Sequence, residues 1–251
     1  MKKRNAILIL YIIIILINNH ANSQKNIDIQ KLLWTRYYLK LKLNETYQIK
    51  QEFEERTFWS PWRQHQFITR TLLSRKLDNR LDTGIGLVYS SQSIPQDPEI
   101  HNFTNVSELR PQLEVTYQQN LSDKIGINHR YWSEFRFIEQ QGGYFNYSNN
   151  RSRYKLELNY TITSKTTLKI FDEILLNIGG NLVHNVFDQN RYGINIQHMP
   201  LKNLGFEIGY MNWFQERASG VDFYNRHIIR LTIHQTVNFK KLNQSKNVRI
   251  I

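Results

Sequence analysis

Residues 153–170 read RYKLELNYTITSKTTLKI, and apolar or aromatic side chains occupy nearly every second position. Leu156 and Leu158 lie on one side of this alternation, whereas Lys155 and Glu157 lie on the other. Because successive side chains of an extended strand point to opposite faces, the segment predicts a β-hairpin with one apolar and one charged face. Whether protein or lipid covers the apolar face then decides the class of fold.

Similar alternation recurs along most of the chain. The runs are mostly 9–14 residues long, whereas strands of globular proteins average about 5–6 residues. A tilted strand needs about 9–11 residues to cross a bilayer, so these runs have the length of membrane-spanning strands. The predicted strands are 33–43, 46–59, 62–76, 80–89, 108–117, 124–137, two strands within 153–170, 189–197, 204–214 and 227–239.

The connections between these runs alternate between short and long. Short turns at one edge and longer loops at the other are typical of an up-and-down barrel in an outer membrane. Short turns are predicted at 44–45, 78–79, 120–123, 163–166 and 200–203, and longer polar loops at 92–106, 139–150, 179–188 and 215–225.

A soluble periplasmic β-sandwich that binds a ligand is the main alternative fold. It predicts short strands, turns rich in glycine and proline, and Greek-key crossovers, whereas this chain has long strands and only 5 prolines. The low mean hydropathy of −0.55 fits a membrane barrel, because only one face of each strand meets lipid. Aromatic residues also collect near strand ends, as in interfacial girdles: Trp34, Trp59, Trp62, Tyr89, Tyr117, Tyr160, Tyr210 and Phe214.

We therefore predict an all-β fold, an up-and-down antiparallel transmembrane β-barrel that follows an N-terminal signal peptide. The alternating runs number eleven, but bacterial single-chain barrels have an even number of strands. We expect about twelve strands, with ten as the alternative. A short strand within 25–33, or a strand merged or divided around 62–76 or 92–107, would make the number even.

The first residues have the order of a secretory signal peptide. Basic residues at 2–4 precede an apolar run at 6–17, and small residues follow at 21 and 23. The apolar run is short for a membrane-spanning helix of about 20 residues, although an uncleaved anchor stays the alternative. Export, together with the predicted barrel, predicts an outer membrane as the location. The predicted divisions are a signal peptide at 1–23, the barrel at 24–239 and a polar tail at 240–251.

The chain resembles a known family, above all in its second half. The segments EILLN, FDQNR and LGFEIGYMN, within 171–215, are the most specific, and the similarity extends roughly from Trp34 to Phe239. On these motifs the chain resembles the uncharacterised outer-membrane barrel family called domain of unknown function 2490. The resemblance implies an outer-membrane barrel of a Gram-negative bacterium. It implies no activity, because none is assigned to that family.

The last predicted strand ends on an aromatic residue, Phe239, with apolar residues such as Val237 and Ile233 at alternate positions. This pattern resembles the final strand that the barrel assembly machinery recognises. We therefore expect that machinery as a partner during insertion, and outer-membrane lipid as the surroundings of the barrel. The tail at 240–251 departs from the pattern, because the recognised strand usually ends the chain.

No motif in the sequence indicates an enzyme or a metal protein. The chain has no cysteine, which excludes disulfides, thiolate zinc sites and cysteine nucleophiles. Asp97, His101 and Ser107 fall within or beside one polar loop, but such a loop collects these residue types by composition alone. We expect no catalytic residue, no metal and no cofactor. An outer-membrane enzyme that modifies lipids stays an alternative function.

The formal net charge of +12 raises the question of nucleic-acid binding. The basic residues, however, alternate with glutamates on one strand face, as Lys50 and Arg56 do with Glu52 and Glu54. This pattern favours a network of ion pairs inside a barrel. We expect no nucleic-acid partner, and the sequence indicates no specific protein partner.

The charged strand faces form the main candidate site, the lumen of a narrow pore or of a passive structural barrel. Because a narrow lumen must be filled by side chains, we favour a structural network of arginine and glutamate over a lumen that selects solutes or binds a ligand. Seven of the eleven candidates are basic, so the lumen should be net positive. The candidates are Arg130, Glu134, Arg136, Arg153, Lys155, Glu157, Lys169, Glu173, Arg191, Glu207 and Arg230.

Three further residues test the assignment of the two faces. Trp132 and Trp213 should lie inside the barrel and compete with the charged side chains for space. The alternation places Asp172 on the lipid face in mid-strand, where a charge is costly. A bulge or an inward turn at this position would remove that cost.

Overall fold

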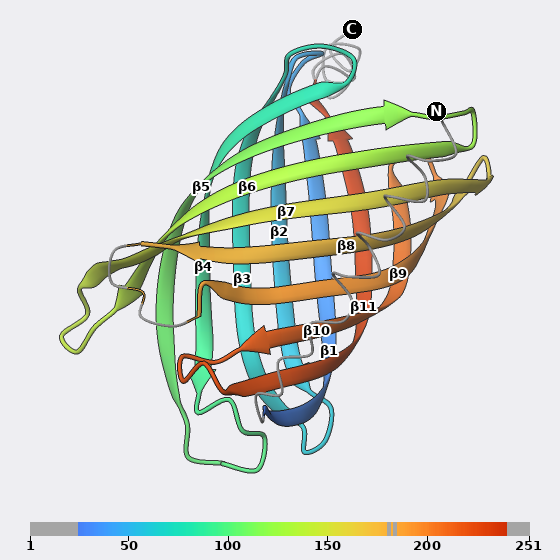
Figure 1. Ribbon diagram of the computed structural model, residues 1–251. Coiled ribbons are helices and arrows are strands. Elements are labelled where there is room, and N and C mark those ends of the chain that lie inside the picture. Colours follow the sequence, from blue (N-terminus) through green and yellow to red (C-terminus); the bar gives the residue numbers. More distant parts are fainter. Residues whose placement is uncertain (1–24, 180–181, 183–184, 240–251) are drawn as a thin grey trace, which may run out of the picture.

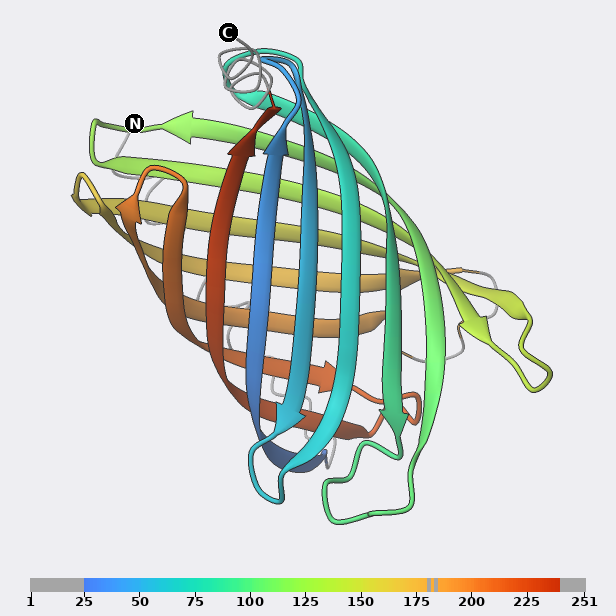
Figure 2. The same ribbon diagram turned by 180° about the vertical axis from the view of Figure 1, so that it is seen from behind.

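The computed structural model describes residues 25–179, 182 and 185–239, and these form one closed β-barrel (Figures 1 and 2). The predicted signal peptide and C-terminal tail lie outside the described residues. No helix formed by the described residues is long and apolar enough to cross a bilayer. The strands are β1 (Asn26–Lys42), β2 (Tyr47–Phe58), β3 (Arg63–Lys76), β4 (Leu81–Ile94), β5 (Thr104–Asn120), β6 (Ile125–Glu139), β7 (Phe145–Thr163), β8 (Thr166–Ile178), β9 (Phe187–Leu201), β10 (Leu204–Glu216) and β11 (Asp222–Asn238).

The barrel closes through a parallel pair. Each strand from β1 to β10 is antiparallel to the next one along the chain, but β1 and β11 run in the same direction, from Asn26 opposite Asp222 to Lys42 opposite Asn238. An up-and-down barrel with an odd number of strands must close in this way, because its first and last strands point the same way. The start of β1 and the end of β11 therefore lie at opposite ends of the barrel (Figure 2).

The all-β, up-and-down barrel is confirmed, but the expected total of twelve strands, or of ten, is corrected to eleven in the described residues. Residues 26–33 extend β1 instead of forming a separate strand. Residues 63–76 form a single strand, β3, and the segment 92–107 contributes only the ends of β4 and β5 and the loop between them. Parallel pairing of β1 with β11 satisfies the edges that a twelfth strand would otherwise have covered.

Short and long connections lie at two different ends of the barrel, as the sequence predicts. In Figure 1 the short turns reach the top and right, and the long loops reach the bottom and left. The loops are shorter than expected because β4, β5, β7 and β11 continue past their predicted bounds. We call the end with turns 43–46, 77–80, 121–124, 164–165 and 202–203 the turn end, and the end with connections 59–62, 95–103, 140–144, 179–186 and 217–221 the loop end.

The two faces of the sheet differ sharply in chemistry. Leu156 and Ile208 on the outward face are 41% and 56% exposed, whereas Glu134 on the inward face is fully buried. Exposed large apolar side chains occur on every strand, so the apolar surface continues around the barrel. Soluble monomers rarely expose a contiguous apolar surface of this extent. A single closed sheet with an apolar outside and a charged inside leaves no second layer, so the fold is not a β-sandwich.

The predicted place of Trp34 in the interfacial aromatic girdle is wrong. It is buried inside the barrel and packs edge to face against Trp213, with 5.7 Å between ring centroids. Because β1 begins earlier than predicted, Trp34 lies in the middle of a strand and not near its end. Trp59 and Trp62, in contrast, are exposed in the connection between β2 and β3 at the loop end.

Asp172 stays on the outward face, where the alternation places it. No bulge turns it inward, since the register shift between β8 and β9 lies further along, between Leu175 and Leu176. Its carboxylate accepts a hydrogen bond from Nδ2 of Asn190 on the neighbouring strand, at 2.9 Å. The cost of the outward charge is thus reduced by one hydrogen bond and not by burial.

Candidate functional site in the lumen

The structure places all eleven predicted lumen residues on the inward faces of β6 to β11, where they are buried or half-buried. Six of them are buried, namely Glu134, Arg153, Glu173, Arg191, Glu207 and Arg230. The other five are partly accessible from the lumen, namely Arg130, Arg136, Lys155, Glu157 and Lys169. Burial of so many charges requires that most be paired, and their partners define the site.

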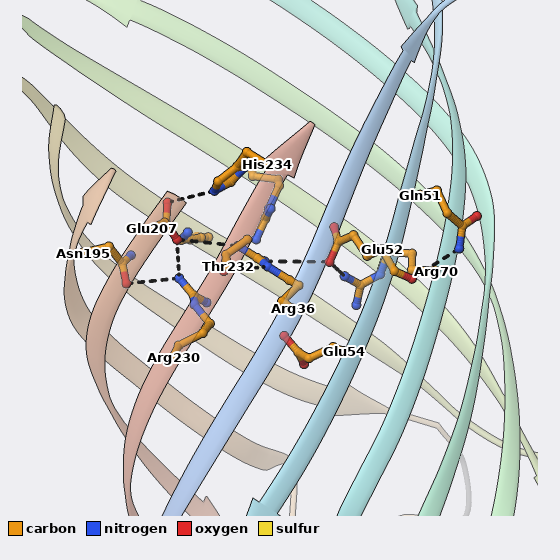
Figure 3. A network of polar contacts seen from close by, with 12 residues as sticks. Arg36, Gln51, Glu52, Glu54, Arg70, Asn195, Glu207, Arg230, Thr232 and His234 are labelled. Atoms are coloured by element: carbon orange, nitrogen blue, oxygen red, sulfur yellow. Dashed lines mark hydrogen bonds and ion pairs between the residues drawn. The ribbon is translucent and has the colours of Figure 1, made fainter. Parts of the chain in front are cut away.

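Glu207 on β10 is the centre of one cluster of ion pairs (Figure 3). Its carboxylate lies 2.8 Å from Nζ of Lys169 and 3.3 Å from Nη2 of Arg230. Arg36 on β1 lies 3.6 Å from the same carboxylate and 3.8 Å from that of Glu52 on β2. Arg36 therefore connects β10 to β2 across the parallel seam between β1 and β11.

Arg153 on β7 joins its two neighbouring strands. One of its terminal nitrogens donates to Glu134 on β6 and the other to Glu173 on β8, each at 2.9 Å. Arg130 adds a second cation 3.6 Å from Glu173. Charge-assisted hydrogen bonds of this kind are stronger than neutral ones and hold both partners in fixed positions. The network thus fixes guanidinium groups at defined places on the wall of the lumen.

Tryptophan rings fill the space between the guanidinium groups. Trp132 has Arg130 at 3.9 Å and Arg153 at 4.1 Å from its ring, and Trp213 has Arg191 at 4.6 Å. Both indoles are buried inside the barrel, as predicted from the alternation. The inner apolar cluster consists of Leu32, Trp34, Phe58, Phe171, Met211, Trp213 and Ile228. These side chains, together with the ion pairs, occupy much of the lumen.

The network is larger than the eleven candidates. The alternation of Lys50 and Arg56 with Glu52 and Glu54 already indicated an inward network on this strand, although these four residues were not counted among the candidates. The alternation of charges in 108–117 was a sufficient signal for Glu108, Arg110 and Glu114. Arg151, Asp188 and Arg226 gave no such signal, because they lie outside the predicted strands. The inward charges that the sequence analysis did not place in the network are Arg36, Arg70, Glu108, Arg110, Glu114, Arg151, Asp188 and Arg226.

Two cavities lie one behind the other in the lumen. The loop-end cavity has a volume of about 410 Å³, and the mid-lumen cavity has a volume of about 360 Å³. Four arginines line both cavities and separate them, and we call them the arginine layer: Arg56, Arg70, Arg153 and Arg191. A guanidinium group only donates hydrogen bonds and keeps its positive charge, so this layer can attract anions and repel cations.

The polar loop between β4 and β5 does not assemble a catalytic triad. Asp97 accepts a hydrogen bond from the backbone N–H of Glu99, and Ser107 lies beside the hydroxyl of Tyr89. No hydrogen bond links Asp97, His101 and Ser107 to one another in the described part of the chain. The described residues also contain no group of three or more histidine, aspartate or glutamate side chains that could hold a metal ion.

Comparison with known proteins gives a family and one structural likeness. No curated protein sequence matches the chain. A similar chain among solved structures is described as "NanC porin structure in rhombohedral crystal form"; it is 12% identical, with a TM-score of 0.49, and the alignment covers 80% of this chain and 96% of that chain. The family model described as "Protein of unknown function (DUF2490)" matches residues 32–225, and the chain belongs to this family.

Proposed function

We propose that the protein is an outer-membrane β-barrel whose narrow, largely filled lumen admits small anions in preference to cations. The continuous apolar outward face fits a lipid environment, and strands of 12 to 19 residues are long enough to span it at a tilt. The proposal includes insertion by the barrel assembly machinery, with outer-membrane lipid around the apolar face.

The arginine layer is the observation that carries the proposed selectivity. A solute that passes between the two cavities must pass these four guanidinium groups, because they form part of both walls. Rings of arginine and lysine favour anions by attraction and by excluding cations. Tryptophans and ion pairs narrow the same region, so the steady current should be small.

The structural and the selective interpretations of the network support each other. Glu52, Glu134 and Glu173 fix arginines of the layer in place. The mid-lumen therefore contains both signs of charge, whereas the layer itself presents only arginine. A network that fills the barrel can at the same time hold the arginines that make the lumen selective for anions.

Reconstitution in a planar bilayer tests this function. We expect little steady conductance and an anion preference in the current that does appear. A large, cation-selective current from the unmodified protein would contradict both the filled lumen and the selectivity. Cell fractionation, combined with mobility on gels before and after boiling, tests the location: recovery in the soluble periplasm with no shift on boiling would contradict the membrane barrel.

A further inference from the structure

The loop-end cavity has the size of a small-molecule site. Its volume of about 410 Å³ lies within the range of about 300–1,000 Å³ that is usual for ligand pockets. Side chains from ten strands and three loops surround it, which makes it a cavity of the whole barrel and not of one loop. Its lining contains eight arginines and only two acidic residues: Arg56, Arg70, Arg110, Arg136, Arg151, Arg153, Arg191 and Arg217, with Asp188 and Glu216.

Several of these arginines form ion pairs with carboxylates that do not line the cavity. Glu108 accepts hydrogen bonds from Arg110 at 2.7 Å and from Arg136 at 2.5 Å. Each guanidinium group has five N–H donors, and one carboxylate engages at most two of them in a fork. Donors therefore remain for a ligand, and the side chains lose little entropy on binding because they are already fixed.

Arg191 is the buried arginine of this cavity that forms no ion pair with a carboxylate of the described residues. It is 7% exposed, and no carboxylate of the described residues lies within 4.0 Å of it. Its side chain donates to Oε1 of Gln189 and lies over the ring of Trp213, but its buried Nε has no partner in the described part of the chain. A buried cation without a counter-ion is costly, and a bound anion would supply the missing charge.

Neutral amides complete the lining. Gln92, Gln96, Gln189 and Gln215 offer both donors and acceptors around the arginines. We propose that the loop-end cavity binds a small organic anion that carries at least two carboxylate or phosphate groups. A single charge would leave most of the arginine donors unused, whereas two separated anionic groups can engage Arg191 and a second guanidinium group together. This inference rests on the proposed function and deepens it by naming the class of anion.

Isothermal titration of the folded barrel in detergent with citrate, at constant ionic strength, tests the site. We expect saturable binding of one citrate per chain. The variant Arg191→Gln should bind citrate about tenfold more weakly or worse, because it loses a charge-assisted hydrogen bond. It should still fold, since no carboxylate of the described residues loses its ion pair. Arg75→Gln is the matched control, because Arg75 is exposed on β3 near the turn end and should leave citrate binding unchanged.

The gel shift on boiling shows whether each variant is folded. If Arg191→Gln does not fold, Arg217→Gln replaces it, because Arg217 is exposed in the loop at 217–221, next to the ring of Tyr224. Absence of saturable citrate binding, or equal binding by the cavity variant and Arg75→Gln, would overturn the site. An anion-selective current would survive that result, so failure of the binding site and failure of the proposed pore are distinguishable.

Discussion

Nζ of Lys50 lies 3.0 Å from Oε1 of Glu114, although β3 and β4 separate their strands. The contact therefore spans part of the lumen and joins two walls of the barrel. Both side chains are largely shielded from solvent, with 16% and 6% exposed. Glu114 also accepts a hydrogen bond from the indole N–H of Trp132, so its carboxylate connects three strands.

Removal of only one partner of this pair should destabilise the barrel more than removal of both. Lys50→Met leaves the Glu114 carboxylate buried without its cation, which typically costs about 3–5 kcal/mol. The double variant Lys50→Met with Glu114→Gln leaves no unpaired charge and keeps an acceptor for Trp132. The urea concentration at which the unboiled gel band is lost measures the difference. Equal midpoints for the single and the double variant would show that the pair does not stabilise the barrel.

The alternation of apolar and charged residues was enough to predict the barrel and its inward face. Leu156 and Glu157, for example, differ in their side of the sheet because a strand has a period of two residues. Trp34 shares its parity with Arg36 and Lys40, so the same rule indicated its inward position. The prediction that Trp34 belongs to the girdle was wrong because it relied on the predicted start of the strand and not on parity.

The register of the closing strand pair and the partners of the inward charges could not be predicted from this alternation. The odd number of strands requires β1 and β11 to pair in parallel, but the register of that pair joins strands at opposite ends of the chain, and no local pattern fixes it. Local alternation likewise does not predict that Lys50 forms an ion pair with Glu114, or that Arg191 forms none with a described carboxylate. These contacts follow from the curvature of the closed sheet, which only the assembled strands define.

A charge on the outward face should hinder insertion, whereas a neutral change on the inward face should not. Ile194→Arg places a charge on the outward face between its register partners Ile170 and Tyr210, at a cost of about 2–4 kcal/mol near the middle of a bilayer. Asn128→Ala changes a side chain that lines the mid-lumen cavity and belongs to no ion pair among the described residues, so no buried charge loses its partner. The fraction of heat-modifiable protein in the membrane compares the two variants. Equal tolerance would refute the assignment of the faces.

The loop end should face the outside of the cell. Gly142 lies in the connection between β6 and β7 with a φ of 99°, in a short polar turn that can accept an inserted epitope. Because β1 starts at the same end, an epitope placed just before Asn26 should be labelled on intact cells together with one at Gly142. An epitope between Lys202 and Asn203, at the turn end, should require permeabilised cells. The reverse pattern would mean that the barrel is inserted the other way round.

Reversal of the charge of an arginine that lines the loop-end cavity should shift the ion preference from anions toward cations. Arg136 and Arg191 both line the loop-end cavity, and Arg191 also belongs to the arginine layer. Arg136→Glu breaks its ion pair with Glu108 but leaves Glu108 paired with Arg110, and Arg191→Glu breaks no ion pair among the described residues; the gel shift on boiling shows whether each variant is folded. Each reversal replaces a cation with an anion beside the path of the ion. The local net charge becomes more negative by two units, which makes the site more favourable for cations. The reversal potential across a salt gradient measures the preference, with Arg75→Glu as a control that makes the same charge change outside the lumen. An equal shift in Arg75→Glu, or none in the two lumen variants, would mean that these arginines do not line the conducting path.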